Sequence, residues 1–119
     1  MTQRIALSNI EQTPTPHGVR WSCTVDVPLS TGLFDGHFPE MPILPGVAQL
    51  LLVNALLRRA VGESTSIAAI GQWKLRARVA PEASVRVSIE PTGVASGWRF
   101  ALTDPRGGPI SNGTLTVAV

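Results

Sequence analysis

A histidine followed by three regularly spaced prolines is the feature of this sequence that points most directly to chemistry. The stretch from Gly36 to Val47 reads GHFPEMPILPGV, with a proline at every third position from Pro39 to Pro45. Each proline ring fixes φ and removes a backbone donor, so this spacing favours an extended, polyproline-like path over a helix or a paired strand. We therefore expect a rigid arm that holds the imidazole of His37, a group able to exchange protons near neutral pH, in a set position.

Few other side chains are candidates for chemistry. Cys23 shares a strand face with Trp21 and Val25, which indicates a buried, inert thiol. His17 lies in the stretch from Pro14 to Gly18 and is expected to be a surface turn residue. Two histidines twenty residues apart and one cysteine do not form a ligand set of recognised spacing, and no glycine-rich phosphate loop precedes a helix. We therefore expect neither a metal nor a nucleotide.

The composition indicates a single folded domain covering residues 1–119. The chain is 44% hydrophobic and 15% charged, and no linker, repeat or low-complexity stretch divides it. Ten basic against eight acidic residues give a net charge of +2, too small an excess to indicate nucleic acid binding. The first ten residues are polar, and the longest apolar run, Leu50 to Val53, is far too short to cross a bilayer. A cytoplasmic protein with no signal peptide and no membrane segment is expected.

The periodicity of the sequence predicts an α+β fold. Apolar residues at every second position from Val19 to Val27 predict a strand with one buried face, and a weaker strand from Arg4 to Thr13 precedes it. The prolines and the glycine from Pro14 to Gly18 predict the turn of a hairpin. Further strands are expected at 66–80, 85–89, 98–102 and 110–119. Residues 28–46 have no periodicity and predict a long functional loop.

One helix is expected between the two groups of strands. Residues 47–61 read VAQLLLVNALLRRAV, with eleven of fifteen positions apolar, and Gly62 stands where a C-cap is expected. A helix that is hydrophobic on nearly every side must be surrounded by other structure. We therefore predict a curled antiparallel sheet of five or six strands wrapped around one central apolar helix.

This order of elements, together with the loop motif, resembles the hotdog fold of the dehydratases that act on 3-hydroxyacyl groups carried by acyl carrier protein. The matching residues are Gly36 to Pro39, Pro42, and Ile43 to Val47, in the family's order and spacing. The stretch from Trp73 to Pro81 also resembles the family, so the resemblance covers essentially the whole chain. Phe34-Asp35, ILPGVAQL and WKLR are most similar to the subgroup associated with aryl polyene biosynthesis.

The resemblance implies loss of water from a 3-hydroxyacyl thioester, as in fatty acid biosynthesis, to give the trans-2-enoyl thioester without a cofactor. The acyl group would be carried on acyl carrier protein or coenzyme A. His37 would be the base that removes the C2 proton, and the backbone N–H groups of Gly46 and Val47 would hold the thioester oxygen. The first N–H groups of a helix have no partner within it, and the dipole there favours an oxyanion. Phe38 and Leu51 would line the acyl pocket.

The sequence departs from the family at its second catalytic group. The family has a carboxylate fourteen residues after the histidine, and that position is Leu51 here. A glutamine that the family often has four residues later corresponds to Ala55, and residues 47–61 contain no Asp or Glu. The C3 hydroxyl leaves poorly unless it is protonated, and a positioned acid contributes about 10² to 10⁴ in rate. His37 alone is therefore expected to be a poor dehydratase.

Three explanations for the missing acid stay open. Another group could replace it, with Glu40 and Asp35 as the nearest carboxylates in sequence and Asn54 as a hydrogen-bonding residue or a contact to a partner subunit. In the family two chains pair edge to edge, and each site combines the histidine of one chain with the acid of the other. A homodimer, or a higher oligomer of this chain, would lack the acid, whereas a heterodimer with an acid-bearing paralogue would restore one site. Finally, the protein could bind or hydrolyse acyl thioesters without dehydrating them, with Leu51 enlarging an apolar tunnel.

Basic residues are candidates for docking an acidic carrier. Lys74, Arg76 and Arg78 alternate on one predicted strand, and Arg58 and Arg59 end the predicted helix. Acyl carrier proteins are acidic, so these side chains could bind the carrier or a phosphopantetheine phosphate. Ordinary solvated charges are the alternative, and arginines at a helix end also complement its dipole.

Overall fold

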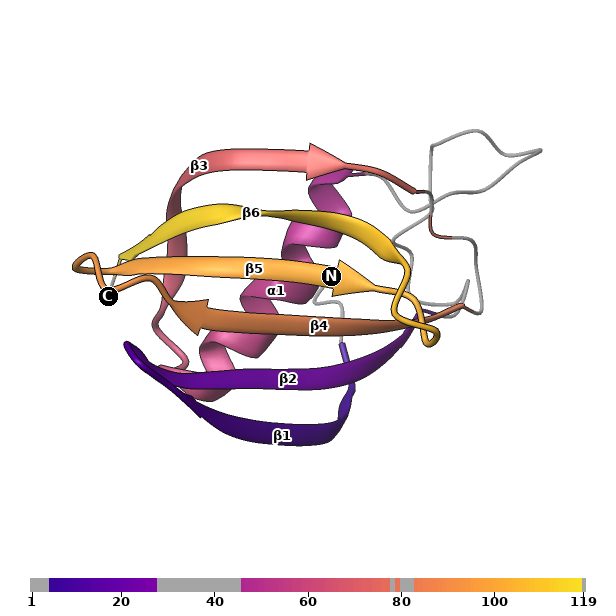
Figure 1. The fold of residues 1–119 in the computed structure, drawn as a ribbon, viewed down its shortest axis with the longest axis horizontal. Coiled ribbons are helices and arrows are strands. Elements are labelled where there is room, and N and C mark those ends of the chain that lie inside the picture. The colour runs from indigo at the N-terminus through magenta and orange to yellow at the C-terminus, as the bar shows by residue number, and fades with distance from the viewer. Residues whose placement is uncertain (1–4, 28–45, 78, 80–82, 119) are drawn as a thin grey trace.

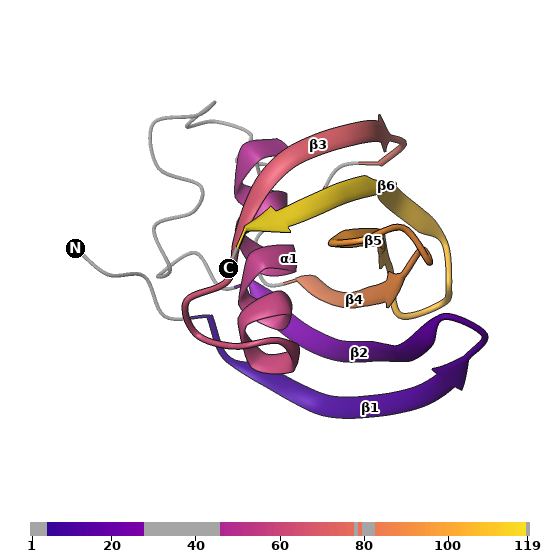
Figure 2. The same ribbon diagram turned by 90° about the vertical axis from the view of Figure 1, so that its left-hand side faces the viewer.

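A curled antiparallel sheet packed on one helix forms the part of the chain described by the computed structural model, residues 5–27, 46–77, 79 and 83–118. In chain order the elements are β1 (Leu7–Thr15), β2 (Gly18–Val27), α1 (Gly46–Ala60), β3 (Ser66–Leu75), β4 (Ala83–Pro91), β5 (Gly97–Thr103) and β6 (Pro109–Ala118). The six strands form one sheet in the order β1-β2-β4-β5-β6-β3. This sheet curls around α1 (Figure 1, Figure 2). The predicted α+β architecture is confirmed.

The hairpin of β1 and β2 differs from the prediction at its turn. β1 continues through Pro14, which pairs with Val19, and Pro16 and His17 form the turn. Proline is tolerated inside β1 because β1 is an edge strand, whose outer side needs no hydrogen-bonded neighbour. His17 is exposed, as predicted. Gly18 follows it with φ +138, a conformation that a residue with a side chain would adopt only under strain.

The edge strand β1 is tied to the sheet through one arginine. β1 contains a bulge around Asn9, which has φ 50. The guanidinium of Arg86, on β4, donates to the carboxylate of Glu11 at 2.8 Å and to the hydroxyls of Ser22 and Thr24 at 3.0 Å each. It also donates to the carbonyl of Asn9 at 3.4 Å. These bonds cross β2, so β1, β2 and β4 are held together on the outer face of the sheet.

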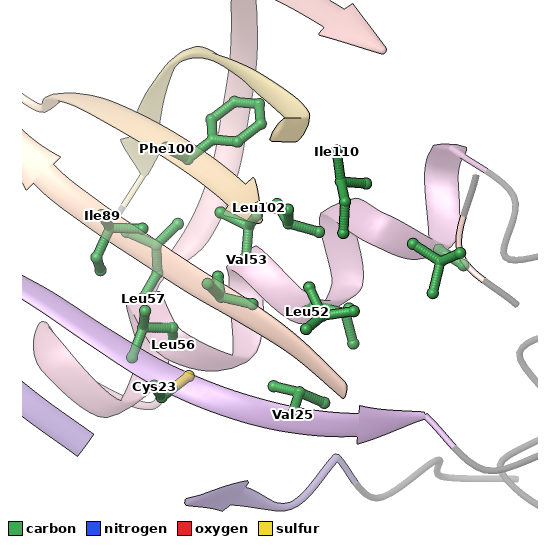
Figure 3. Packing of buried hydrophobic residues seen from close by; sticks show 14 of the residues in the cluster. Cys23, Val25, Leu52, Val53, Leu56, Leu57, Ile89, Phe100, Leu102 and Ile110 are labelled. Carbon is green, nitrogen blue, oxygen red and sulfur yellow. The ribbon is translucent and has the colours of Figure 1, made fainter. Parts of the chain in front are cut away.

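The hydrophobic core lies between the sheet and one face of α1 (Figure 3). On this inward face of α1, the side chains of Leu52, Val53, Leu56 and Leu57 are fully buried. Their partners in the core come from four strands: Cys23, Val25, Val85, Val87, Ile89, Phe100, Leu102 and Leu115. Inward residues alternate with polar ones along each strand, as one buried sheet face requires.

On the opposite side of α1, no strand among the described residues packs against the helix in the same way. On this outward face Leu51 is 44% exposed, and Val61, just past the helix, is 42% exposed. The expectation that other structure surrounds the helix is therefore met by the described residues on the inward side. An apolar composition all round the helix does not distinguish a side chain packed in the core from one left open at the surface.

β3 ends five residues earlier than predicted. The expected strand extended to Ala80, but the backbone N–H groups of Arg76 and Ala77 both donate to the carbonyl of Ile110, at 2.7 and 3.1 Å. One carbonyl that accepts two consecutive N–H groups interrupts the regular ladder, so β3 stops at Leu75. Two register shifts against β6 also bend β3 along its length (Figure 1).

Among the residues that the structure describes, no helix has the length and hydropathy to cross a bilayer.

Candidate functional site

The start of α1 provides backbone donors for a substrate oxygen. Gly46 and Val47 are the first two residues of the helix. The first four N–H groups of an α-helix have no acceptor within the helix. The first turn contains no acidic side chain, so no carboxylate of α1 itself offsets the positive end of the helix dipole. Such an end can stabilise negative charge that develops on a thioester carbonyl oxygen.

A polar side chain that sequence reasoning missed lies in the same turn. Gln49 is only 3% exposed, and its Oε1 atom has no hydrogen-bond partner among the described residues. Its spacing from Leu52 and Val53 places it on the inward face of α1. The signal was present in the sequence, because Gln49 is the one polar residue between Val47 and Val53. A buried amide without a partner costs free energy, so its presence calls for a functional or a structural reason.

The outward face of α1 forms the floor of a groove of about 790 Å³. Its described lining residues are Ile5, Leu51, Asn54, Ala55, Arg58, Arg59, Gly62 and Glu63. Leu51, which is predicted to occupy the position of the acid, lies in an open groove, whereas its neighbours Leu52 and Val53 lie in the closed core. An acyl pocket that includes Leu51, as predicted, would have to form between this face of α1 and whatever covers it.

Asn54 and Arg58 supply the polar groups of this groove. They lie three and seven residues after Leu51, so all three side chains follow one face of the helix. The Oδ1 atom of Asn54 is buried and has no hydrogen-bond partner among the described residues. The Nε of Arg58 donates to the carbonyl of Thr65 at 3.3 Å, which holds this side chain at the C-terminal end of the helix. There its charge complements the helix dipole.

Glu63 is the carboxylate among the described lining residues of the groove, and sequence reasoning did not consider it. It follows the end of α1, whereas Leu51 is the sixth residue of the helix. At 1.5 Å per residue, the helix alone carries the chain about 13 Å from Leu51 to Ala60. Glu63 therefore stands at the far end of the groove and does not replace the missing acid within this chain.

Several predicted site residues lie outside the described part of the chain. They are His37, Phe38, Glu40 and Arg78, together with the neighbouring Asp35. Their roles therefore stay predictions. Of the other predicted docking residues, Lys74 and Arg76 are exposed at the end of β3, and Arg58 and Arg59 are exposed at the end of α1. The structure thus separates these cations into two groups, one on the sheet and one on the helix.

The cysteine is part of the core. The Cys23 side chain is fully buried on β2. Burial raises the pKa of its thiol from an ordinary value of 9.0 to about 11, and the positive charge of Arg86 lowers it by a smaller amount. The thiol is therefore protonated at neutral pH, as predicted for an inert cysteine.

Within residues 5–27, 46–77, 79 and 83–118, no three His, Cys, Asp or Glu side chains gather in a way that could hold a metal ion.

Comparisons with known proteins point to one family and one fold. A family model described as ApeI dehydratase, of the ApeI-like family, matches residues 11–114. None of the curated proteins matches the sequence. Among solved structures, an uncharacterized protein from Erwinia carotovora subsp. atroseptica has a TM-score of 0.82 and 19% identity, over 97% of this chain and 96% of that one.

Two further solved structures carry descriptive names. The dehydratase heterocomplex ApeI:P from Xenorhabdus doucetiae has a TM-score of 0.78 and 21% identity, over 100% of both chains. The candidate thioesterase yhdA from Lactococcus lactis has a TM-score of 0.69 and 16% identity, over 94% of this chain and 90% of that one. At these identities the likeness shows the fold alone. The predicted hotdog fold is confirmed.

Proposed function

Because the chain belongs to the ApeI-like dehydratase family, we propose that it is a subunit of an enzyme that removes water from 3-hydroxyacyl thioesters carried on acyl carrier protein or coenzyme A. His37 takes the proton from C2, and the electrons of that C–H bond form an enolate whose oxygen accepts hydrogen bonds from the N–H groups of Gly46 and Val47. When the enolate collapses, the C3–O bond breaks, the hydroxyl leaves with a proton as water, and the trans-2-enoyl thioester remains. The helix start without acidic residues supports the enolate-binding step.

The proton for the leaving hydroxyl comes, in this proposal, from a partner chain. The observation that carries it is the position of Leu51, which stands 44% exposed on the outward face of α1 where the family has its acid. The described carboxylate that lines the same groove, Glu63, is displaced along the helix by more than its last two turns. The structurally similar ApeI:P from Xenorhabdus doucetiae is a dehydratase heterocomplex. By analogy, this chain contributes His37 and an acid-bearing partner contributes the carboxylate.

The exposed edge of β3 is the place where we expect the partner to pair. β3 is the last strand of the sheet, and its outer side has no neighbouring strand among the described residues. The other edge strand, β1, is less suited to pairing because it contains a bulge and Pro14. In such a pair the open groove over Leu51 would be covered, and the buried Oδ1 of Asn54 would gain a hydrogen-bond donor.

Restoring an acid at position 51 is the sharpest test. Leu51→Glu should raise the rate of dehydration by this chain alone by about 10² or more, because a positioned general acid contributes at least that factor. The measurement follows the absorbance of the conjugated enoyl thioester formed from a 3-hydroxyacyl thioester. Leu51→Gln is the matched control, since it has the same length and polarity but cannot act as an acid.

Mixing experiments test the partner. Wild-type protein alone should turn over slowly, and addition or co-expression of an acid-bearing hotdog paralogue should restore activity. His37→Ala in this chain should abolish that activity, because the base is then absent from the shared site. Full activity of the isolated wild-type chain would instead favour a substitute acid within it, and Glu40→Gln would identify whether that acid is Glu40.

A second function, binding or hydrolysis of acyl thioesters without dehydration, is favoured by one observation. The position of the acid holds an apolar side chain, and Ala55 one turn later is also apolar, so this face can lie along an acyl chain. In that case Leu51→Glu would weaken binding of a long-chain acyl thioester and would form no enoyl product. Release of free thiol from the thioester would identify hydrolysis.

A further inference from the structure

A second groove, of about 300 Å³, lies on the outer face of the sheet, away from α1. Its described lining residues come from β3, from Arg76 just after β3, and from β4, β5 and β6: Gln72, Lys74, Arg76, Ser88, Glu90, Arg99, Phe100, Ala101, Asn112, Gly113 and Thr114. The strand registers arrange the outward side chains in two rows across the sheet. One row contains Ser88, Ala101, Asn112 and Lys74, and the other contains Glu90, Arg99 and Thr114. Ala101 is the short member of its row, so the surface is hollowed over it.

Positive charge dominates this groove. Lys74, Arg76 and Arg99 are exposed cations, and Glu90 is the carboxylate that lines the groove with them. Glu90 stands directly opposite Arg99 in the β4 and β5 register, yet no ion pair within 4.0 Å joins them. The described lining residues therefore include three cations and one anion, although the whole chain has a net charge of only +2. Sequence reasoning missed Arg99, because only the register of the strands brings it into the same groove as Lys74.

Arg86, on β4, differs from Arg99 in that its guanidinium has partners within the fold. Arg86 lies on the same outer face but pairs with Glu11 at 2.8 Å and with two hydroxyls at 3.0 Å each. Arg99 has no such side-chain partner among the described residues, and neither do Lys74 and Arg76. Arg86 is thus used within the fold, whereas the guanidinium of Arg99 remains available to another molecule.

We propose that this groove docks the acidic surface of the carrier protein that brings the acyl group, an inference that rests on the proposed function. Cations in complementary positions steer an acidic partner and fix its orientation. Two strand spacings separate β3 from β5, and Arg99 lies one row away from Lys74 in the register, so the backbones of the two residues stand about 12 Å apart. That distance is too wide for one phosphate to bridge but matches carboxylates two turns apart on an acidic helix.

The place of the groove suits this role. Lys74 and Arg76 lie at the end of β3, and α1 begins at the same end of the molecule (Figure 1). A carrier seated there would have its acyl arm directed toward the end of the molecule at which the N–H groups of Gly46 and Val47 are found. Arg58, at the opposite end of α1, donates to Thr65 and lies over the helix groove, so the sheet group is better placed for docking.

Binding without turnover tests the proposal. The probe is an acyl carrier protein loaded with a saturated acyl chain, which has no hydroxyl to lose, titrated into the protein, or into its complex with a partner, at low ionic strength. Arg99→Ala and Lys74→Ala should each weaken binding about two- to fivefold, as expected for exposed charge pairs. Glu90→Gln should strengthen it by a similar factor. Arg20→Ala, which removes an exposed cation of β2 outside the groove, is the matched control and should change nothing.

The outcomes separate this proposal from the dehydratase proposal. Equal affinities for Arg99→Ala, Lys74→Ala and Arg20→Ala would overturn docking at this groove, as would competition by millimolar inorganic phosphate that depends on Arg99. A 3-hydroxyacyl thioester of pantetheine has no protein carrier, so in complex with the acid-bearing partner Arg99→Ala and Lys74→Ala should dehydrate it at the rate of the wild-type complex. If the variants lose carrier binding but the wild-type complex with the acid-bearing partner does not dehydrate the pantetheine substrate, docking stands and the dehydratase proposal fails.

Discussion

Leu51 and Leu52 are adjacent in sequence and identical in chemistry, yet the side chain of Leu52 is fully buried and that of Leu51 is 44% exposed. They belong to two faces of α1 that differ in what lies opposite. The inward face meets side chains of four strands, whereas the outward face forms the floor of an open groove. An exposed apolar stripe with polar groups beside it is typical of a surface that another molecule covers. Both faces carry apolar side chains, but among the described residues only the inward face packs against the strands of the sheet.

The largest expected difference between the faces is in stability. Leu56→Ala, on the inward face, should lower the free energy of unfolding by about 2–5 kcal/mol, because it removes a fully buried side chain and leaves a cavity. Leu51→Ala, on the outward face, should change it by less than about 0.5 kcal/mol. Denaturant unfolding of the isolated chain measures both. A large loss for Leu51→Ala would mean that the outward face is already covered, as in a homodimer.

The next largest effect is a dependence of stability on pH, caused by the thiol of Cys23, which packs in the core with the inward face of α1. The folded pKa of Cys23 is about 11 and its ordinary value is 9.0, so the folded state keeps its proton where the unfolded state loses it. The stabilisation is complete below pH 9 and is lost as the pH rises from 9 to 11, by on the order of 2 kcal/mol. Unfolding at pH 8 and pH 10.5 measures this. Cys23→Ala is the control and should show a smaller decrease over the same range.

A smaller effect is expected from the polar group on the inward face. Gln49→Leu removes a buried amide whose Oε1 has no partner among the described residues, so the unfolding free energy should rise by about 1 kcal/mol. If the amide serves the substrate, dehydration in the presence of the partner should fall at the same time. Gln49→Met provides an apolar side chain of similar length as a control. A loss of stability in both variants would show that Gln49 holds the fold together instead.

The smallest change in the isolated chain is expected at the outward face. Asn54→Ala should alter the unfolding free energy by less than about 0.5 kcal/mol, since the lost Oδ1 has no partner among the described residues. It should nevertheless weaken binding of the partner chain severalfold, because the hydrogen bond expected across the interface is then absent. Titration of the labelled partner measures this. Unchanged partner affinity would contradict the covering of Asn54 by the partner.

Local patterns in the sequence predicted most of the fold, and contacts between distant residues account for what they missed. The alternation from Val19 to Val27 predicted β2, and the apolar run that follows Gly46 predicted α1, because burial imposes these periods on the sequence itself. The end of β3 was misplaced because it depends on the carbonyl of Ile110, more than thirty residues away.

The candidate site shows the same division. The positions of Gly46 and Val47 at the helix start followed from the sequence, since proline and glycine mark the boundary. The exposure of Leu51 did not, because contact with a partner and contact with the core select the same apolar residue types. Arg99 was missed because the registers of β5 with β6 and of β6 with β3 decide which outward side chains share the groove.

Protein fibres grow when both edge strands of a sheet can pair with strands of further chains. In this molecule one edge strand is β1. The bulge at Asn9 and the missing N–H group of Pro14 interrupt the row of backbone hydrogen-bonding groups that an incoming strand would need. A second copy adding at β3 would present its own β1 at the far side. Growth of the sheet by addition of further chains then stops at two chains. The residues that disrupt the edge at β1 therefore also limit the size of the assembly.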